Sequence, residues 1–293
     1  MRAEIESAIR LLRSSDPDAV EKALALLQDT VFSFSMRVCG QREDAEDTMQ
    51  EVLVKSLPYL PKFDNPRALL VWLYKVAKNR CLMSRRKSKF APMQNLSLEE
   101  LMPDRKELES LRQDGGINPE ALAIRSESAH RLREAIQKLP PQYRIVLVMR
   151  DMEGLTDDEV AEITGLRPGT VRVRLHRARL FVRKELSQRH SRSRRTRPVT
   201  AAPAPQALPR PARCKAMFAE LSNYLDEQLD DSLCTELEKH MRGCEPCQAF
   251  LSTLESTILQ CRQSPKDSPN RRKASVIRKE LMESYERALA GQK

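Results

Sequence analysis

A helix-turn-helix pattern lies in LPPQYRIVLVMRDMEGLTDDEVAEITGLRPGTVRVRLHRARLFVRKEL, residues 139–186. Thr156 and Glu159 form a capping box, in which the hydroxyl and the carboxylate satisfy backbone N–H groups that the first helical turn leaves unpaired. Gly165 can adopt the left-handed backbone that ends this helix, and Pro168 suits the first turn of the next one. The pattern therefore predicts a short helix, a tight turn and a second helix from about residue 168 to 186.

The second helix of this pair has one apolar face and one basic face. At about 100° per residue, the apolar face carries Val171, Leu175, Ala178 and Val182 and should pack on the preceding helices. The opposite face carries Arg172, Val173, His176 and Arg177, flanked by Arg174, Arg179, Arg183 and Lys184. A helix of this charge fits the major groove of DNA, and a solvated basic surface is the alternative.

The composition predicts an all-α protein with a polyanionic partner. The 293 residues suffice for two or three small domains, and the net charge of +10 favours nucleic acid over a membrane. No apolar run approaches the roughly 20 residues of a membrane-spanning helix, and the N-terminus lacks the features of a signal peptide, so we expect a cytoplasmic protein. Seven cysteines in a reducing compartment indicate thiols or metal ligands before disulfides. Helix formers dominate and glycine is scarce.

Residues 20–90 are predicted to form one helical module. Residues 41–57 keep apolar side chains at helical spacing beneath an acidic surface, which is either an interface for a basic partner or a solvated face. Residues 66–89 are predicted to form an apolar helix whose second half is rich in Lys and Arg and could bind phosphates. Trp72 and Tyr74 could stack on unpaired bases, although Trp72 in so apolar a run is expected in the core. Cys39 and Cys81 are expected to be small core residues.

Three segments together resemble a known family. DAEDTMQEVLVK (44–55), VWLYKVAKNRCL (71–82) and the helix-turn-helix stretch look like regions 2 and 4 of a bacterial sigma-70-type factor of the extracytoplasmic-function (ECF) group. The match covers about residues 20–186, and the order of the two blocks makes it specific. The resemblance implies a protein that binds core RNA polymerase and directs it to promoters, with region 2 at the −10 element and region 4 at the −35 element.

The resemblance also implies roles for individual residues. The polymerase clamp would be met by Asp47, Gln50 and Glu51, and the −10 element by Asn79, Arg80, Arg85 and Arg86. The −35 element would be read by Arg172, Val173, His176 and Arg177, with Arg174 and Arg179 beside them. One departure concerns Met83 and Ser84, which stand where family members often carry an aspartate, so the resemblance does not extend to the detailed −10 contacts.

The predicted domain order follows from these blocks. Region 2 occupies residues 1–90, a linker of mixed charge 91–119, and region 4 residues 120–186. Residues 187–213 contain five prolines, seven arginines and no acidic residue, which predicts a disordered tether. A small module follows at 214–262, and a tail at 263–293 could add an amphipathic helix between Ala274 and Leu289.

The module at 214–262 has the residues of a metal site. It contains five of the seven cysteines and nine acidic against four basic residues. His240, Cys244 and Cys247 have the spacing H-x3-C-x2-C, which places three ligands at one helix end, and Cys214 could complete a tetrahedral Cys3His site. Thiolates and imidazole favour zinc, in a structural or regulatory role. A thioredoxin-like redox pair is the alternative, but its strand-helix context is lacking. Cys234 and Cys261 are either buried apolar fillers or extra thiols for a second metal or a regulatory disulfide.

The module as a whole resembles the zinc-binding anti-sigma family, here fused to its sigma factor. The first hypothesis is therefore a sigma factor regulated in cis through an intramolecular contact between the module and the sigma domains. In a second hypothesis, the module is a docking domain that assists the sigma factor. A third is a helix-turn-helix repressor or activator without sigma activity. An enzyme is not expected, because no phosphate-binding glycine loop or nucleophile–base pair is evident.

Overall fold

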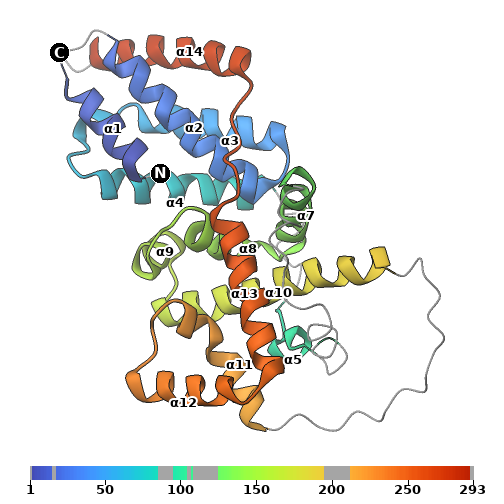
Figure 1. Ribbon diagram of the computed structural model, residues 1–293. Helices are drawn as coiled ribbons and strands as arrows, with labels where there is room; N and C mark the ends of the chain where they lie inside the picture. The colour runs from blue at the N-terminus through green and yellow to red at the C-terminus, as the bar shows by residue number, and fades with distance from the viewer. Residues whose placement is uncertain are drawn as a thin grey trace. The chain divides into compact units, whose positions relative to one another are not determined.

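The structure is a computed structural model that describes residues 2–14, 18–84, 95–103, 107, 125–194 and 212–290. Every regular element within these ranges is a helix, which confirms the predicted all-α class (Figure 1). The chain divides into two compact units. The first contains Met1–Met93, Val148–Val171 and Pro265–Lys293, and the second contains Gln94–Leu147 and Arg172–Ser264. Among the helices in the described ranges, none has the length and apolarity to cross a membrane.

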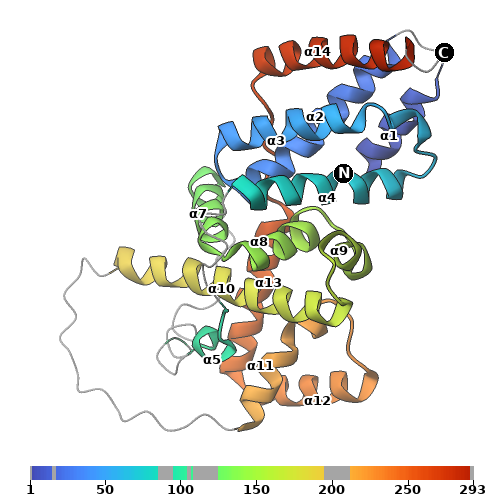
Figure 2. The same ribbon diagram turned by 180° about the vertical axis from the view of Figure 1, so that it is seen from behind.

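The first unit is built on four N-terminal helices. These are α1 (Arg2–Leu12), α2 (Ala19–Cys39), α3 (Arg42–Ser56) and α4 (Pro66–Ser84), with a 3-10 turn, η1, at Leu60–Lys62. Their apolar stripes meet in a core that includes Phe32, Met49 and Leu69, each with no exposed surface. Helix α14 (Arg271–Ala290) lies along α2 and α3, as Figure 2 shows from behind. The predicted tail helix is therefore present.

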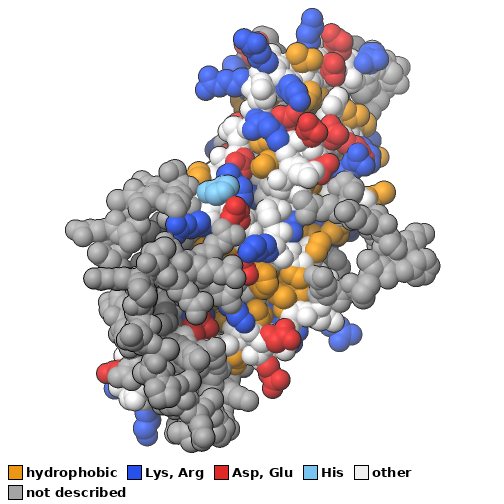
Figure 3. Space-filling view, turned by 90° about the vertical axis from the view of Figure 1, so that its right-hand side faces the viewer, with side chains coloured by type: hydrophobic (Ala, Val, Ile, Leu, Met, Phe, Trp, Pro, Cys, Tyr) orange, Lys and Arg blue, Asp and Glu red, His pale blue; other side chains and the backbone are white. Residues whose placement is uncertain are grey.

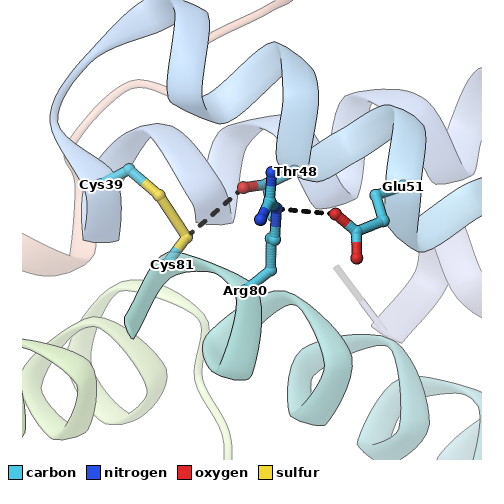
Figure 4. Close-up of a disulfide and its surroundings, with 5 residues drawn as sticks. All are labelled: Cys39, Thr48, Glu51, Arg80 and Cys81. Atoms are coloured by element: carbon cyan, nitrogen blue, oxygen red, sulfur yellow. Dashed lines mark hydrogen bonds and ion pairs between the residues drawn. A yellow bond between two sulfur atoms is a disulfide. The ribbon is translucent and has the colours of Figure 1, made fainter. Parts of the chain in front are cut away.

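A disulfide joins two helices of the first unit. Cys39, the last residue of α2, is bonded to Cys81 of α4, with their Cα atoms 5.6 Å apart (Figure 4). Both residues are buried, as predicted, but the expectation of thiols rather than disulfides is wrong for this pair. The two residues are 42 positions apart in sequence, and only the packing of α2 against α4 brings them within disulfide range.

The second unit gathers helices around α10 (Pro168–Arg194), which enters this unit at Arg172. The others are α5 (Leu98–Leu101), α7 (Arg125–Lys138), α8 (Pro141–Leu147), α11 (Ala212–Leu225), α12 (Asp231–Arg242) and α13 (Glu245–Arg262). One apolar core combines Leu101 of α5, Leu180 of α10, Phe218 of α11, Leu237 of α12 and Phe250 of α13. The rings of Phe218 and Phe250 meet edge to face at 4.7 Å between centroids.

Two predicted boundaries need correction. Helix α10 continues to Arg194, so the start of the expected disordered tether is helical; the first proline after Pro168 comes only at Pro198. The rest of the tether, 195–211, lies outside the described residues. Part of the expected linker is also ordered, because it contains helix α5. Leu101 of this helix is 4% exposed, since the apolar side chains of α5 join the core of the second unit.

Candidate DNA-binding and metal-binding sites

The helix-turn-helix begins with the predicted capping box. The backbone N–H of Glu159 donates to Thr156 Oγ1 over 3.2 Å, and the backbone N–H of Thr156 donates to Glu159 Oε2 over 2.8 Å. Helix α9 (Asp157–Thr164) then ends at Gly165, whose φ of 75° is the left-handed conformation expected there. Helix α10 starts at Pro168. The sequence therefore predicted both caps of α9 and the start of α10 correctly.

The faces of α10 are only partly as predicted. Its apolar residues Val171, Leu175, Ala178 and Val182 are all buried, as expected. On the predicted DNA face, Arg172 and Val173 are exposed and Arg174 and Arg177 are half-buried. His176 is 7% exposed and Arg179 is 1% exposed. These two side chains are covered by the α11 segment in this conformation, and their role at the −35 element stays a prediction.

Helix α11 contacts α10 through two polar pairs within the second unit. Arg179 donates from Nη1 to Asp226 Oδ2 over 2.7 Å and from Nη2 to Asp226 Oδ1 over 3.0 Å. His176 Nδ1 lies 2.7 Å from Ser222 Oγ. The side chain of Asp226 is only 7% exposed, so this bidentate ion pair between Arg179 and Asp226 is shielded from water. A carboxylate in this position occupies the hydrogen-bond donors that Arg179 would otherwise offer to a phosphate or a base edge.

Arg183, one turn further along α10, is buried in the same unit. Its guanidinium donates to Glu107 Oε1 over 2.8 Å and to Thr253 Oγ1 over 2.9 Å, and it lies 3.8 Å from the centroid of the Phe250 ring. Burial lowers the pKa of Arg183, and the charge of Glu107 opposes that shift. No local pattern in the sequence pointed to these particular partners. Only the acidic composition of residues 214–262 indicated that the module could bind a basic surface.

The buried His176 makes the contact between α10 and α11 sensitive to pH. Burial, reinforced by Arg179 and Arg177, lowers the pKa of His176 from 6.5 to about 4. The neutral imidazole is therefore the form that packs, and the contact is fully present above pH 6.5 and weakens as the pH falls toward 4. We expect acidification from pH 7.5 to 5.5 to shift the equilibrium about tenfold toward the uncovered form. Hydrogen exchange of α11, corrected for intrinsic rates and measured with excess zinc, tests this.

The control for the pH experiment is His176→Gln, which keeps a polar side chain but does not titrate in this range. Its exchange in α11 should be independent of pH between 7.5 and 5.5. An equally large acid response in His176→Gln would assign the effect to other groups.

Three of the predicted metal ligands lie together at the junction of α12 and α13. His240 is in the last turn of α12, Cys244 is the N-cap residue of α13, and Cys247 is in its first turn. His240 Nε2 and Cys244 Sγ each lie 3.3 Å from Cys247 Sγ, and the candidate ligand atoms of the three residues lie within 4.8 Å of one another. Two thiolates at about 2.3 Å from one tetrahedral ion would be about 3.8 Å apart, so the set fits zinc. The side chain of Cys214, the predicted fourth ligand, lies outside the described residues.

The remaining cysteines of the module differ in burial. Cys261 is 1% exposed and is therefore placed as a buried filler would be, whereas Cys234 is half-buried. Neither belongs to the group formed by His240, Cys244 and Cys247.

The predicted polymerase-binding residues lie on α3. Asp47 is exposed, and Gln50 Nε2 is 3.5 Å from Glu280 Oε2 of α14. Glu51 accepts from Lys55 Nζ over 2.7 Å and pairs with Arg80 Nε of α4, also over 2.7 Å (Figure 4). The hydrogen bond from Lys55 is the main cause that lowers the pKa of Glu51, and the charge of Arg80 adds to it. Two of the three candidates are thus engaged within the first unit.

The predicted −10 residues are only partly described. Asn79 is exposed near the end of α4, and Arg80 is half-buried against Glu51. Arg85 and Arg86 lie outside the described residues. Tyr74 is 2% exposed and belongs to the core. Trp72 is half-buried with its ring 6.1 Å from that of Tyr59 and 6.2 Å from that of Phe63, so it is not as deeply buried as predicted.

Helix α14 contacts helices α2 and α3 of the first unit. Lys273 Nζ pairs with Glu46 Oε2 of α3 over 2.8 Å, Arg278 Nε donates to Gln28 Oε1 of α2 over 3.0 Å, and Leu281 is buried. Val276 lies within the predicted amphipathic segment between Ala274 and Leu289 but is 59% exposed, so this apolar side chain does not pack against the first unit. Figure 3 shows basic and acidic side chains interspersed on the described part of the face that it draws.

Comparisons with protein families identify both sigma regions. The model of sigma-70 region 2 matches residues 24–90, and that of sigma-70 region 4 matches residues 129–182. A zinc-finger family model matches residues 214–248, which include Cys214 and the cluster at the α12–α13 junction. The chain thus combines the two regions of a sigma-70-type factor with a zinc-finger-like segment.

Curated relatives narrow this class. The ECF RNA polymerase sigma factor SigW of Bacillus subtilis is 30% identical over 186 residues, which cover 64% of this chain and 98% of SigW. SigE of Mycolicibacterium smegmatis is 30% identical over 164 residues, covering 56% of this chain and 60% of that protein. The sigma-E factor of Escherichia coli is 29% identical over 140 residues, covering 46% and 70%. The chain therefore belongs to the ECF RNA polymerase sigma factors, the transcription initiation factors that direct polymerase to promoters.

Proposed function

We propose that this sigma factor is regulated in cis, with residues 212–290 holding the sigma regions in an inactive conformation. The observation that carries the proposal is the burial of Arg179 against Asp226, because a candidate DNA-reading side chain is occupied by a carboxylate of the C-terminal module. His176 and Arg183 are covered from the same side, by Ser222 of α11 and by Phe250 and Thr253 of α13. DNA cannot reach these side chains while α11 and α13 remain in place.

A second contact supports the same proposal at region 2. Helix α14 packs along α2 and α3, and its Glu280 reaches Gln50, one of the three candidate polymerase-binding residues. Lys273 neutralises Glu46 on the same helix. A polymerase surface that binds the acidic side of α3 would have to displace α14 first. The C-terminal residues thus cover candidate surfaces for both partners of the factor, core polymerase and promoter DNA.

We further propose that His240, Cys244 and Cys247 bind zinc, with Cys214 as the fourth ligand. When bound, the ion would connect the end of α12 to the start of α13, and Cys214 would add the first turn of α11. Cys247 is itself part of the apolar core that contains Phe250, the ring under Arg183. The zinc site would therefore stabilise the surface that covers α10, which gives it a structural role and makes it a point of regulation.

In the promoter complex, the proposed −35 contacts are Arg172, Val173, Arg174, His176, Arg177 and Arg179, and the proposed −10 contacts are Asn79, Arg80, Arg85 and Arg86. Polymerase would contact Asp47, Gln50 and Glu51. Arg172 and Val173 are already exposed, whereas His176 and Arg179 become available only after α11 leaves. Promoter recognition by region 4 is therefore incomplete in the covered conformation.

A truncated chain ending at residue 194 tests the regulation in cis. The 186 residues that align with SigW account for 98% of that protein, so the shortened chain corresponds to an almost complete sigma factor. We expect it to support at least tenfold more promoter-dependent transcription with core polymerase than the full chain, because Arg179 and α3 are uncovered. Equal activity would refute cis-inhibition, and a loss of transcription would instead indicate that the C-terminal module assists the factor.

A further inference from the structure

A second group of buried charges lies within the first unit and includes no residue of the zinc module. Glu153 directly follows the helical segment Val148–Met152. Both lie within the residues that match sigma region 4. Glu153 Oε1 accepts from Arg37 Nη1 of α2 over 2.7 Å, and its Oε2 accepts from Tyr74 OH of α4 over 3.2 Å. We call these three residues the Glu153 cluster. Arg37 and Tyr74 belong to region 2.

The Glu153 cluster is almost completely removed from water. The side chains of Arg37 and Glu153 are 5% and 0% exposed. Burial raises the pKa of Glu153, and the charge of Arg37 opposes that shift. Tyr74 is fixed from its other side by Phe34, whose ring meets it edge to face at 4.5 Å. A buried ion pair with a third hydrogen-bonding partner contributes little net stability, but it disfavours any arrangement in which one charge loses the other.

Further polar contacts within the first unit join the same two sigma regions. Lys78 Nζ of α4 donates to the backbone oxygen of Ile163, near the end of α9, over 2.8 Å. Arg67, at the start of α4, lies 3.3 Å from Glu162 Oε2 and 3.9 Å from Glu159 Oε1 of α9. Two basic side chains of α4 are thus paired with carboxylates and with one backbone carbonyl of α9.

This contact between regions 2 and 4 is incompatible with the extended promoter complex. The −10 and −35 elements are about 25 base pairs apart, or about 85 Å along the duplex at roughly 3.4 Å per base pair. A compact domain of the size of region 4 has a radius of gyration of about 10 Å. Two such domains in direct contact cannot place their DNA-binding faces on both elements, so residues 148–164 must leave α2 and α4 when the promoter is bound.

We propose that the Glu153 cluster is an autoinhibitory contact between the two sigma regions, separate from the zinc module, and that promoter binding requires it to open. The inference goes beyond the proposed regulation in cis by residues 212–290, because all three residues belong to the sigma regions themselves. Opening separates Glu153 from Arg37. In the open form both charged groups must therefore be hydrated or form new ion pairs.

The test is Glu153→Gln in the full-length chain, with hydrogen exchange followed peptide by peptide. Glutamine keeps the size and an acceptor for Tyr74 but leaves the charge of Arg37 buried without its counter-ion. We expect exchange over residues 148–164 to rise at least thirtyfold, while α1, α2 and α3 keep the exchange of the parent chain. The matched control is Glu162→Gln, the same chemical change at a carboxylate that is 55% exposed, which should alter exchange less than threefold.

A rescue variant separates this contact from general stability. Arg37→Met with Glu153→Met removes both charges and fills the space with apolar groups, so protection of residues 148–164 should return to within threefold of the parent chain. Unchanged exchange in Glu153→Gln would overturn the inference. A rise that extends equally over α1–α3 would also overturn it, because the cluster would then only stabilise the region 2 core.

Transcription gives the functional readout and keeps the two proposals distinguishable. Combining Glu153→Gln with Asp226→Asn in the full chain should give at least fivefold more promoter-dependent transcription than Asp226→Asn alone. If the two chains transcribe equally, the contact does not limit promoter binding and the inference fails. If Asp226→Asn alone equals the parent chain, regulation by the module fails, yet the exchange and the comparison between the two variants still decide the role of Glu153.

Discussion

Replacing Asp226 with asparagine should raise promoter-dependent transcription by the full-length chain by one to two orders of magnitude. Asp226 holds both terminal nitrogens of Arg179, and both side chains are almost fully buried. Removing one partner of such a pair costs about 3–5 kcal/mol, and asparagine recovers part of this through its remaining carbonyl oxygen. A net loss of about 2 kcal/mol would shift the balance between covered and uncovered α10 by more than tenfold, since about 1.4 kcal/mol corresponds to a factor of ten.

Asp226→Asn is a sharper test than any change of Arg179, because Arg179 is itself a proposed −35 contact. Loss of the arginine would weaken the covered and the DNA-bound forms together. The matched control is Glu227→Gln, which removes the same charge from the neighbouring residue, whose side chain is exposed. Run-off transcription with core polymerase should distinguish the two chains. If Asp226→Asn and Glu227→Gln behave alike, general loss of acidic charge, rather than the Arg179 pair, is what matters.

Local signals in the sequence predicted the helix-turn-helix because its determinants are close neighbours in the chain. The capping box of Thr156 and Glu159, the left-handed Gly165 and the apolar face of α10 all depend on residues within a few turns of one another. The same holds for the group of His240, Cys244 and Cys247, which one helix end and one helix start bring together. Such features follow from spacing, and spacing can be read directly.

The partners of the basic side chains could not be predicted in the same way. Arg179 meets Asp226 and Arg37 meets Glu153 across 47 and 116 positions of sequence, and helical periodicity carries no information on such pairs. A helical wheel places Arg179 on a basic face but cannot show whether water, DNA or another helix covers that face. The disulfide between Cys39 and Cys81 escaped prediction for the same reason, since only the tertiary packing of α2 and α4 brings the residues together.

Removing zinc from the full-length chain should unfold the junction of α12 and α13 and uncover α10. Structural zinc contributes roughly 10–16 kcal/mol of apparent binding free energy in zinc-finger peptides, and small domains of this kind depend on it for folding. We expect a strong chelator to abolish hydrogen-exchange protection over residues 231–262 and to raise promoter-dependent transcription at least tenfold. Cys244→Ser should reproduce both effects without a chelator, whereas Cys234→Ser, outside the ligand group, should change neither.

The effect of zinc should reach α10 through α13. Cys247 and Phe250 are three residues apart and share one face of this helix, and the Phe250 ring lies 3.8 Å from the guanidinium of Arg183, which also donates to Thr253 one turn further on. Unfolding of residues 231–262 therefore removes Phe250 and Thr253 as partners of Arg183 together with the metal ligands. Cys214→Ser should match Cys244→Ser if Cys214 is the fourth ligand. Full protection and low transcription in the zinc-free chain would show instead that the apolar core alone holds the module on α10.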